Sequence, residues 1–181
     1  MENFLLRAFG ADRPGIVYRI TNELAKLEAN LSDSTMTDLE GQFVIMLSFT
    51  CAAGVSSNFI EAKLKDGLSD LSLNIEVSSI EFHDRVLFSD DESKRVSIRV
   101  YGADRPGIVA GFTKVLYDFG INITDLKTSI TGSESSPNYF LLIVADTPND
   151  VDTVLLENEL KTASTTLGVH MSLDVIAPDT I

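Results

Sequence analysis

Two identical segments carry the side chains best suited to bind a small charged molecule. The sequence Gly-Ala-Asp-Arg-Pro-Gly-Ile-Val spans residues 10–17 and recurs at residues 102–109. Each copy contains a carboxylate and a guanidinium between two glycines, so it offers a partner to a ligand group of either charge. Residues 30–33 (Asn-Leu-Ser-Asp) are matched at the same offset by residues 122–125 (Asn-Ile-Thr-Asp). The rest of the two halves has diverged, so these shared residues are the first candidates for a functional site.

The position of each segment predicts what it could bind. Residues before it alternate with period two, as in a strand, and residues after it follow helical spacing. The first N–H groups of a helix lack intrahelical partners and the helix dipole is positive there, so this end suits a free carboxylate. Gly15 and Gly107 have no Cβ, so a ligand could approach the backbone closely.

An α-amino acid matches this chemistry. Ile16 and Val17 would offer backbone N–H groups while their side chains point to the core. Asp12 or the amide oxygen of Asn30 would accept a hydrogen bond from the ammonium group. Arg13 would pair with the ligand carboxylate, or with an acid across an interface.

Ordinary strand-to-helix chemistry is the alternative explanation. Asp near a helix start, Pro14 in its first turn and a glycine in a tight turn are all common. Asn30 and Asn122 could simply end the preceding helices in a left-handed conformation. A turn does not require arginine, yet Arg13 and Arg105 are both kept, which favours a binding role.

Other chemistries find little support in the sequence. His83 and His170 are the only histidines, and Cys51 is the only cysteine and lies in an apolar run typical of a buried strand. The motifs of zinc proteases, serine hydrolases, phosphate-binding loops and dithiol enzymes are missing. We therefore expect no metal, no cofactor and no catalytic activity.

Charge and hydropathy narrow the partners further. The formal net charge is −13, and neither half carries a basic stripe, which disfavours direct contact with nucleic acid or with an anionic membrane. No apolar stretch reaches the roughly 20 residues that a bilayer span needs. The first residues lack the positive charge and long apolar core of a signal peptide, so we expect a cytoplasmic protein.

The pattern of elements is the same in both halves, β-α-β-β-α-β. It predicts an α+β fold of two ferredoxin-like sandwiches in tandem, each an antiparallel sheet with both helices on one face. The expected domains are residues 1–82 and 96–181, joined by a linker at 83–95. Each sheet would leave one face bare, with candidates Leu5, Phe9 and Tyr101, so we expect a partner domain or subunit to cover it. The expected strands are 4–9, 31–38, 43–51, 73–80, 96–101, 123–131, 139–145 and 169–176, with a longer second hairpin turn at 132–137.

A β-α-β-β-α-β unit with Asp-Arg-Pro-Gly-Ile-Val in its first strand-to-helix loop resembles the ACT domain, a family of small regulatory modules that bind amino acids. Two units filling the chain look like the tandem ACT proteins of the glycine cleavage system transcriptional repressor family. The resemblance implies ligand binding where the first strand meets the first helix, often between two ACT units. The matching positions are Asp12, Arg13, Pro14, Gly15, Ile16, Val17 and Asn30, and Asp104, Arg105, Pro106, Gly107, Ile108, Val109 and Asn122.

The leading hypothesis is therefore an amino-acid-binding regulatory protein that forms a homo-oligomer. The resemblance favours glycine or serine as the ligand and transcription as the output. The acidic charge then implies action through a DNA-binding protein partner. A ligand-free module for oligomerisation or protein interaction is the alternative, and an enzyme is the hypothesis with least support.

Overall fold

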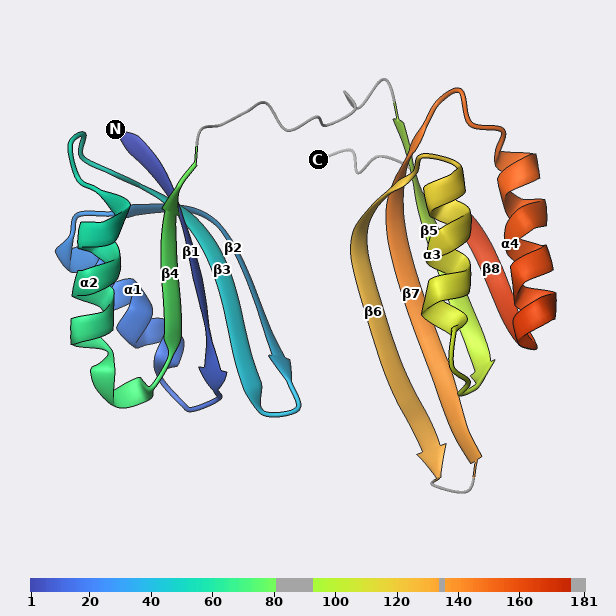
Figure 1. Cartoon of the computed structure of the whole chain (residues 1–181), viewed down its shortest axis with the longest axis horizontal. Coiled ribbons are helices and arrows are strands. Elements are labelled where there is room, and N and C mark those ends of the chain that lie inside the picture. The colour runs from blue at the N-terminus through green and yellow to red at the C-terminus, as the bar shows by residue number, and fades with distance from the viewer. Residues whose placement is uncertain (81–92, 134–135, 177–181) are drawn as a thin grey trace. The chain divides into compact units, whose positions relative to one another are not determined.

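The protein consists of two compact units, Met1–Arg85 and Val86–Ile181 (Figure 1). The structure is a computed structural model, and it describes residues 1–80, 93–133 and 136–176. Most of the expected linker, residues 83–92, lies outside the described residues. The last three residues of the expected linker, 93–95, belong to a strand that begins at Ser93.

The first unit follows the predicted order of elements. Its strands form an antiparallel sheet in the order β2-β3-β1-β4, and both helices cover the same face (Figure 1). A short 3-10 turn at Ser69–Leu71 follows the second helix. The elements are β1 Glu2–Ala11, α1 Ile16–Lys26, β2 Asn30–Leu39, β3 Gln42–Cys51, α2 Ser57–Gly67 and β4 Asn74–Ser79.

The second unit repeats this topology, with the sheet order β6-β7-β5-β8. The prediction of two tandem ferredoxin-like units is thus confirmed. The elements are β5 Ser93–Ala103, α3 Ile108–Asp118, β6 Asn122–Ser133, β7 Ser136–Pro148, α4 Thr153–Leu167 and β8 Val169–Ile176.

Each unit has a core of its own between the sheet and the two helices. Alternate residues of β1, which include Phe4 and Leu6, are fully buried against Ile20 of α1 and Leu64 of α2. Cys51 lies in the same core, and burial raises the pKa of its thiol, as expected for a small structural residue. The second core is built likewise, from Val96, Ile98, Val100, Ile108, Phe112, Leu116, Leu156 and Leu160.

The second hairpin differs from the prediction. The sequence predicts a turn at residues 132–137, but Gly132 pairs with Pro137, and the strands continue to Ser133 and from Ser136. The first hairpin closes through Glu40 and Gly41, both with positive φ as a tight two-residue turn requires. The extra residues of the second half therefore lengthen the strands.

The sheet face opposite the helices is bare in each unit, as predicted. Phe9 and Tyr101 are 52% and 55% exposed on this face. Arg7 and Arg99 also lie there, paired with Glu76 and Asp174 on the neighbouring strands. None of the helices in the described part of the chain is long and apolar enough to cross a bilayer.

The two edges of the first sheet are not alike. Every residue of β2 is exposed, so this edge strand is open along its whole length. At the other edge, the Val77 N–H of β4 donates to the Glu61 carboxylate of α2 at 2.9 Å. A further strand that paired with β4 would need this N–H group, which already donates to Glu61. The β2 edge is therefore more available for strand pairing.

Candidate functional site

The repeated segment forms the same turn in both units. Gly15 has φ 91° and ψ 0°, and Gly107 has φ 93° and ψ −4°, which are the values of the third residue of a type II turn. Proline at the second position and glycine at the third are the residues that this turn favours. The helices begin only at Ile16 and Ile108. The prediction that Pro14 lies within the first helical turn is therefore wrong, because the turn precedes the helix.

The helices that follow these turns have open N-termini. No side chain among the described residues caps α1 or α3. By contrast, Ser56 accepts from the Phe59 N–H at the start of α2, and Asp152 accepts from two N–H groups at the start of α4. A Cβ placed on Gly15 or Gly107 would meet no atom within 4 Å. Space and unpartnered donors therefore coincide at both loops.

This contrast between capped and uncapped helices can be measured. Asp152→Ala should lower the free energy of unfolding by about 1 kcal/mol, because two first-turn N–H groups of α4 lose their acceptor. Asp104→Ala, beside the uncapped α3, should change it by less than about 0.5 kcal/mol. Urea unfolding of both variants tests this, and equal costs would show that Asp104 is also a cap.

The side chains of the loop are placed partly as predicted. Ile16 and Ile108 are each only 2% exposed and point into the cores. Val17 is 40% exposed, so the expectation that its side chain points to the core is wrong. Val109 is half-buried. The preceding side chains of both copies are exposed, from Asp12 to Pro14 and from Asp104 to Pro106. Each loop is thus an open surface.

The asparagines lie at the other end of each sheet. Asn30 is level with Thr50 of β3 and Asn3 of β1, whereas the loop follows Ala11 at the far end of β1. At about 3.3 Å per residue, these two ends of the strand are roughly 25 Å apart. Asn122 is placed in the same way at the start of β6. A single unit therefore brings together the Asp, Arg and Gly of the motif but not the Asn.

The asparagines do not end the helices either. Glu28 and Gly120 take the positive φ values there, 54° and 66°, and Asn30 and Asn122 begin the next strands. A β-bulge follows each asparagine, at Leu31/Ser34 and Ile123/Asp125. The shared Asn-x-Ser/Thr-Asp sequence thus coincides with a shared irregularity of the edge strand.

The surroundings of the two loops differ. Tyr139 lies near Asp104. Burial and the Asp104 carboxylate raise the pKa of the Tyr139 hydroxyl, and a hydrogen bond with Thr128 lowers it by a smaller amount. The equivalent residue of the first unit is Phe43, which has no hydroxyl group. The guanidinium of Arg105 packs over Gly168, with Nη1 2.8 Å from where a Cβ would lie. The two loops are therefore similar in backbone but distinct in their polar neighbours.

An ion pair lies near the first loop, and no motif of the sequence predicts it. Arg19 of α1 donates to both carboxylate oxygens of Asp70 and, at 2.9 Å, to the carbonyl of Gly67. The hydrogen bond from Arg19 lowers the pKa of Asp70, and the charge of Arg13 adds to the effect. Comparing the halves at the offset of 92 could have drawn attention to it, since Arg19 corresponds to Gly111.

The Arg19–Asp70 pair should make stability depend on pH in a defined direction. The folded-state pKa of Asp70 is lowered, so its contribution is present above the unfolded pKa and is lost as pH falls through the folded pKa. Asp70→Asn should therefore be less stable than wild type at neutral pH, by an amount that shrinks below about pH 4. Chemical unfolding across this range measures the difference, and a constant difference would contradict the assignment.

The described residues include no group of His, Cys, Asp and Glu that could hold a metal ion. What the loops offer is a set of hydrogen-bond donors, one carboxylate and one guanidinium in each unit. Such a set can bind a small zwitterion but has no nucleophile and base in contact.

Comparison with known proteins places both loops in a recognised module. Residues 2–78 and 96–162 each match the model of the ACT domain. The glycine cleavage system transcriptional repressor of Escherichia coli is 28% identical over 176 residues, which cover 95% of this chain and 89% of that protein.

Two solved structures share the fold over almost the whole chain. A protein of unknown function from Galdieria sulphuraria has a TM-score of 0.82 at 21% identity, covering 97% of this chain and 99% of its own. A candidate glycine cleavage system transcriptional repressor has a TM-score of 0.72 at 20% identity, covering 98% of each chain. At these identities the structural likeness speaks for the fold alone.

Proposed function

The chain belongs to the ACT-domain family, with two copies in tandem, and from this premise we propose that it is a non-catalytic regulator that binds a free amino acid. The observation that carries the proposal is the repeated type II turn before an uncapped helix. Both copies keep the turn, the exposed Asp and Arg and the open N-terminus. Diverged halves would not need to share all four features for folding alone.

The ligand carboxylate would lie at the first N–H groups of the helix, near Val17 in one unit and Val109 in the other. Asp12 and Asp104 would accept from its ammonium group, and Arg13 and Arg105 would add charge beside the carboxylate. These contacts would bind the carboxylate and ammonium groups, which all amino acids share. The name of the Escherichia coli relative favours glycine or its close analogue serine.

A second copy of the chain would complete the first site. Antiparallel pairing of two β2 edges would bring the start of one strand beside the end of the other. Asn30 of one copy would then approach the loop end of its partner, which its own fold keeps it from reaching. The open β2 edge and the occupied β4 edge support this arrangement. The ligand would thus favour the assembled state because only that state offers all its contacts.

The regulatory output would be transcriptional and would pass through a protein partner in the cytoplasm. The similarity to a transcriptional repressor over nearly the full chain supports the first part. The net charge of −13 supports the second, because it repels the phosphate backbone of DNA. The partner would be a regulator that binds DNA, while this chain binds the amino acid.

Sedimentation velocity of the purified chain, with and without millimolar glycine or serine, tests the proposal. Binding should shift the population toward a larger species, and Leu39→Lys on the exposed β2 edge should weaken that shift. If neither amino acid binds or changes the sedimentation coefficient, the result would favour the alternative function. That alternative is a ligand-free interaction module, favoured by the exposed Phe9 and Tyr101 on the bare sheet faces.

A further inference from the structure

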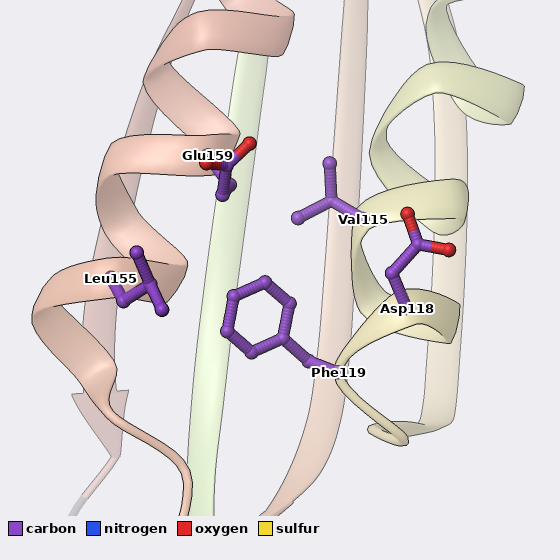
Figure 2. A pocket seen from close by; sticks show the side chains of 5 residues that line it. All are labelled: Val115, Asp118, Phe119, Leu155 and Glu159. Atoms are coloured by element: carbon purple, nitrogen blue, oxygen red, sulfur yellow. The ribbon is translucent and has the colours of Figure 1, made fainter.

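A groove runs between α3 and α4 on the helical side of the second unit. Two neighbouring hollows of about 240 and 320 Å³ share Val115, Asp118 and Glu159, so they form one continuous depression. It extends from Gly111 to Phe119, which corresponds to about 12 Å along the helix. Figure 2 shows the ring of Phe119 reaching from the end of α3 toward α4. The groove is therefore long enough for about two turns of another helix.

The same seam is filled in the first unit. Arg19 of α1 crosses to Asp70 and to the carbonyl of Gly67, with nitrogen–oxygen distances of 2.8 and 2.9 Å. Glu23 lies over Gly67, so close that a Cβ on that glycine would be 2.6 Å from its carboxyl carbon. Lys26 in turn pairs with Glu23 at 2.6 Å. The first unit thus closes the space between its helices with charged side chains.

The second unit lacks these filling side chains. The sheet register relates α3 to α1 by an offset of 92 and α4 to α2 by an offset of 96. By these offsets Arg19 corresponds to Gly111 and Glu23 to Val115. The partner position of the ion pair, Asp70, corresponds to Thr166. At the Gly111 end, Leu167 packs against α3, with its Cδ1 2.7 Å from where a Cβ of Gly111 would lie. The rest of the seam is a partly apolar groove, where the first unit has charged side chains.

The charges at the rim also differ between the units, and Lys114, which lines the groove as well, stands where the first unit has Asn22. The positions of Lys26 and Lys63 in the first unit are occupied by Asp118 and Glu159 in the second. Asp118 pairs with Lys114. Glu159 has no ion-pair partner within the described part of the chain. A cation arriving at the groove would therefore find an uncompensated carboxylate next to apolar side chains.

We propose that this groove binds a basic amphipathic helix of a protein partner. An apolar side chain of that helix would lie between Phe119 and the 49%-exposed Leu155, and a Lys or Arg would pair with Glu159. The occupant is a basic partner, because the carboxylate of Glu159 at the rim has no cation to pair with among the described residues. The inference does not rest on amino-acid binding, since the groove uses no residue of the type II turn.

The test uses the full chain and a synthetic amphipathic helix with leucines on one face and arginines on its flanks. Fluorescence anisotropy of the labelled peptide measures affinity, and NMR shifts of the protein locate the contact. Glu159→Lys restores the charge of the first unit at this position and should weaken binding about tenfold. Leu155→Asp should weaken it by at least about as much. Asp66→Lys, on exposed α2 of the other unit, is the matched change of charge and should weaken it far less.

The outcomes separate this inference from the proposed function. Shifts confined to α3 and α4, together with loss of affinity in the groove variants only, would support the groove. Equal losses of affinity for Glu159→Lys and Asp66→Lys would show that the peptide is attracted by the overall negative charge of the protein. That result would overturn the inference. Shifts on the bare sheet face or on β2 would also overturn it. Variants of the turn glycines, which test amino-acid binding, should bind the peptide as the wild type does.

Discussion

Replacing Gly15 and Gly107 together by valine should abolish the stabilisation that the protein gains from its amino-acid ligand. At a hundredfold excess over Kd, that gain is about 2.7 kcal/mol in the wild type. A valine side chain would project into the open space before the helix N-terminus, where no atom lies within 4 Å of the Cβ position. It would also strain a backbone with φ near +90°, at a cost of about 1–3 kcal/mol at each site.

The strain has a matched control in the same chain. Gly54 and Gly120 also have positive φ, at 88° and 66°, and also face open space. The double variant Gly54→Val/Gly120→Val carries comparable strain in each unit away from the repeated loop. Thermal unfolding with and without ligand should show a shift for this control and none for the Gly15/Gly107 variant. If ligand raised the unfolding temperature of both double variants equally, the loops would not be the binding site.

Phe112→Ala should destabilise the second unit by about 3–5 kcal/mol, the usual cost of truncating a fully buried aromatic side chain. Phe112 is 0% exposed and lies in the core that α3 shares with the sheet. Since whole domains are stable by only about 5–15 kcal/mol, this loss should make the second unit unfold well before the first. Each unit has its own core, so the first should keep its stability.

Tyrosine fluorescence in guanidinium chloride can follow the two transitions separately. The chain has no tryptophan, and of its four tyrosines only Tyr18 lies in the first unit. The fluorescence change of the second unit should therefore move to lower denaturant in Phe112→Ala. Phe140→Ala, the same truncation at a 37%-exposed position of the second unit, should move this transition far less. A single transition that shifts as a whole would mean that the two units unfold together.

The fold was predictable because its signals are local and repeated. Strand and helix periods alternate in the same order twice, and the buried positions of β1, α1 and α2 follow them. The chemistry of the turn was predictable as well, since Pro14 and Gly15 are typical of it. The start of the helix was not, because proline is accepted both in a type II turn and in a first helical turn.

The candidate site could be predicted only in part. Residues adjacent in sequence, such as Asp12 and Arg13, must be near each other in any fold. The position of Asn30 depends on α1, which returns the chain to the opposite end of the sheet before β2 begins. The motif alone does not specify at which end of the sheet Asn30 lies. The groove between α3 and α4 was missed for a different reason. The difference between Arg19 and Gly111 is visible in the sequence, but its effect depends on which side chains cross between the two helices.

Isothermal titration of the purified chain against each of the twenty amino acids would show whether this protein binds a free amino acid at its repeated loops. We expect saturable heat for a small subset that includes glycine or serine, and no heat from the same ligands with Gly15→Val/Gly107→Val. Retained binding in that variant would place the site elsewhere. No binding of any amino acid at millimolar concentration would contradict the claim that this chain is an amino-acid sensor.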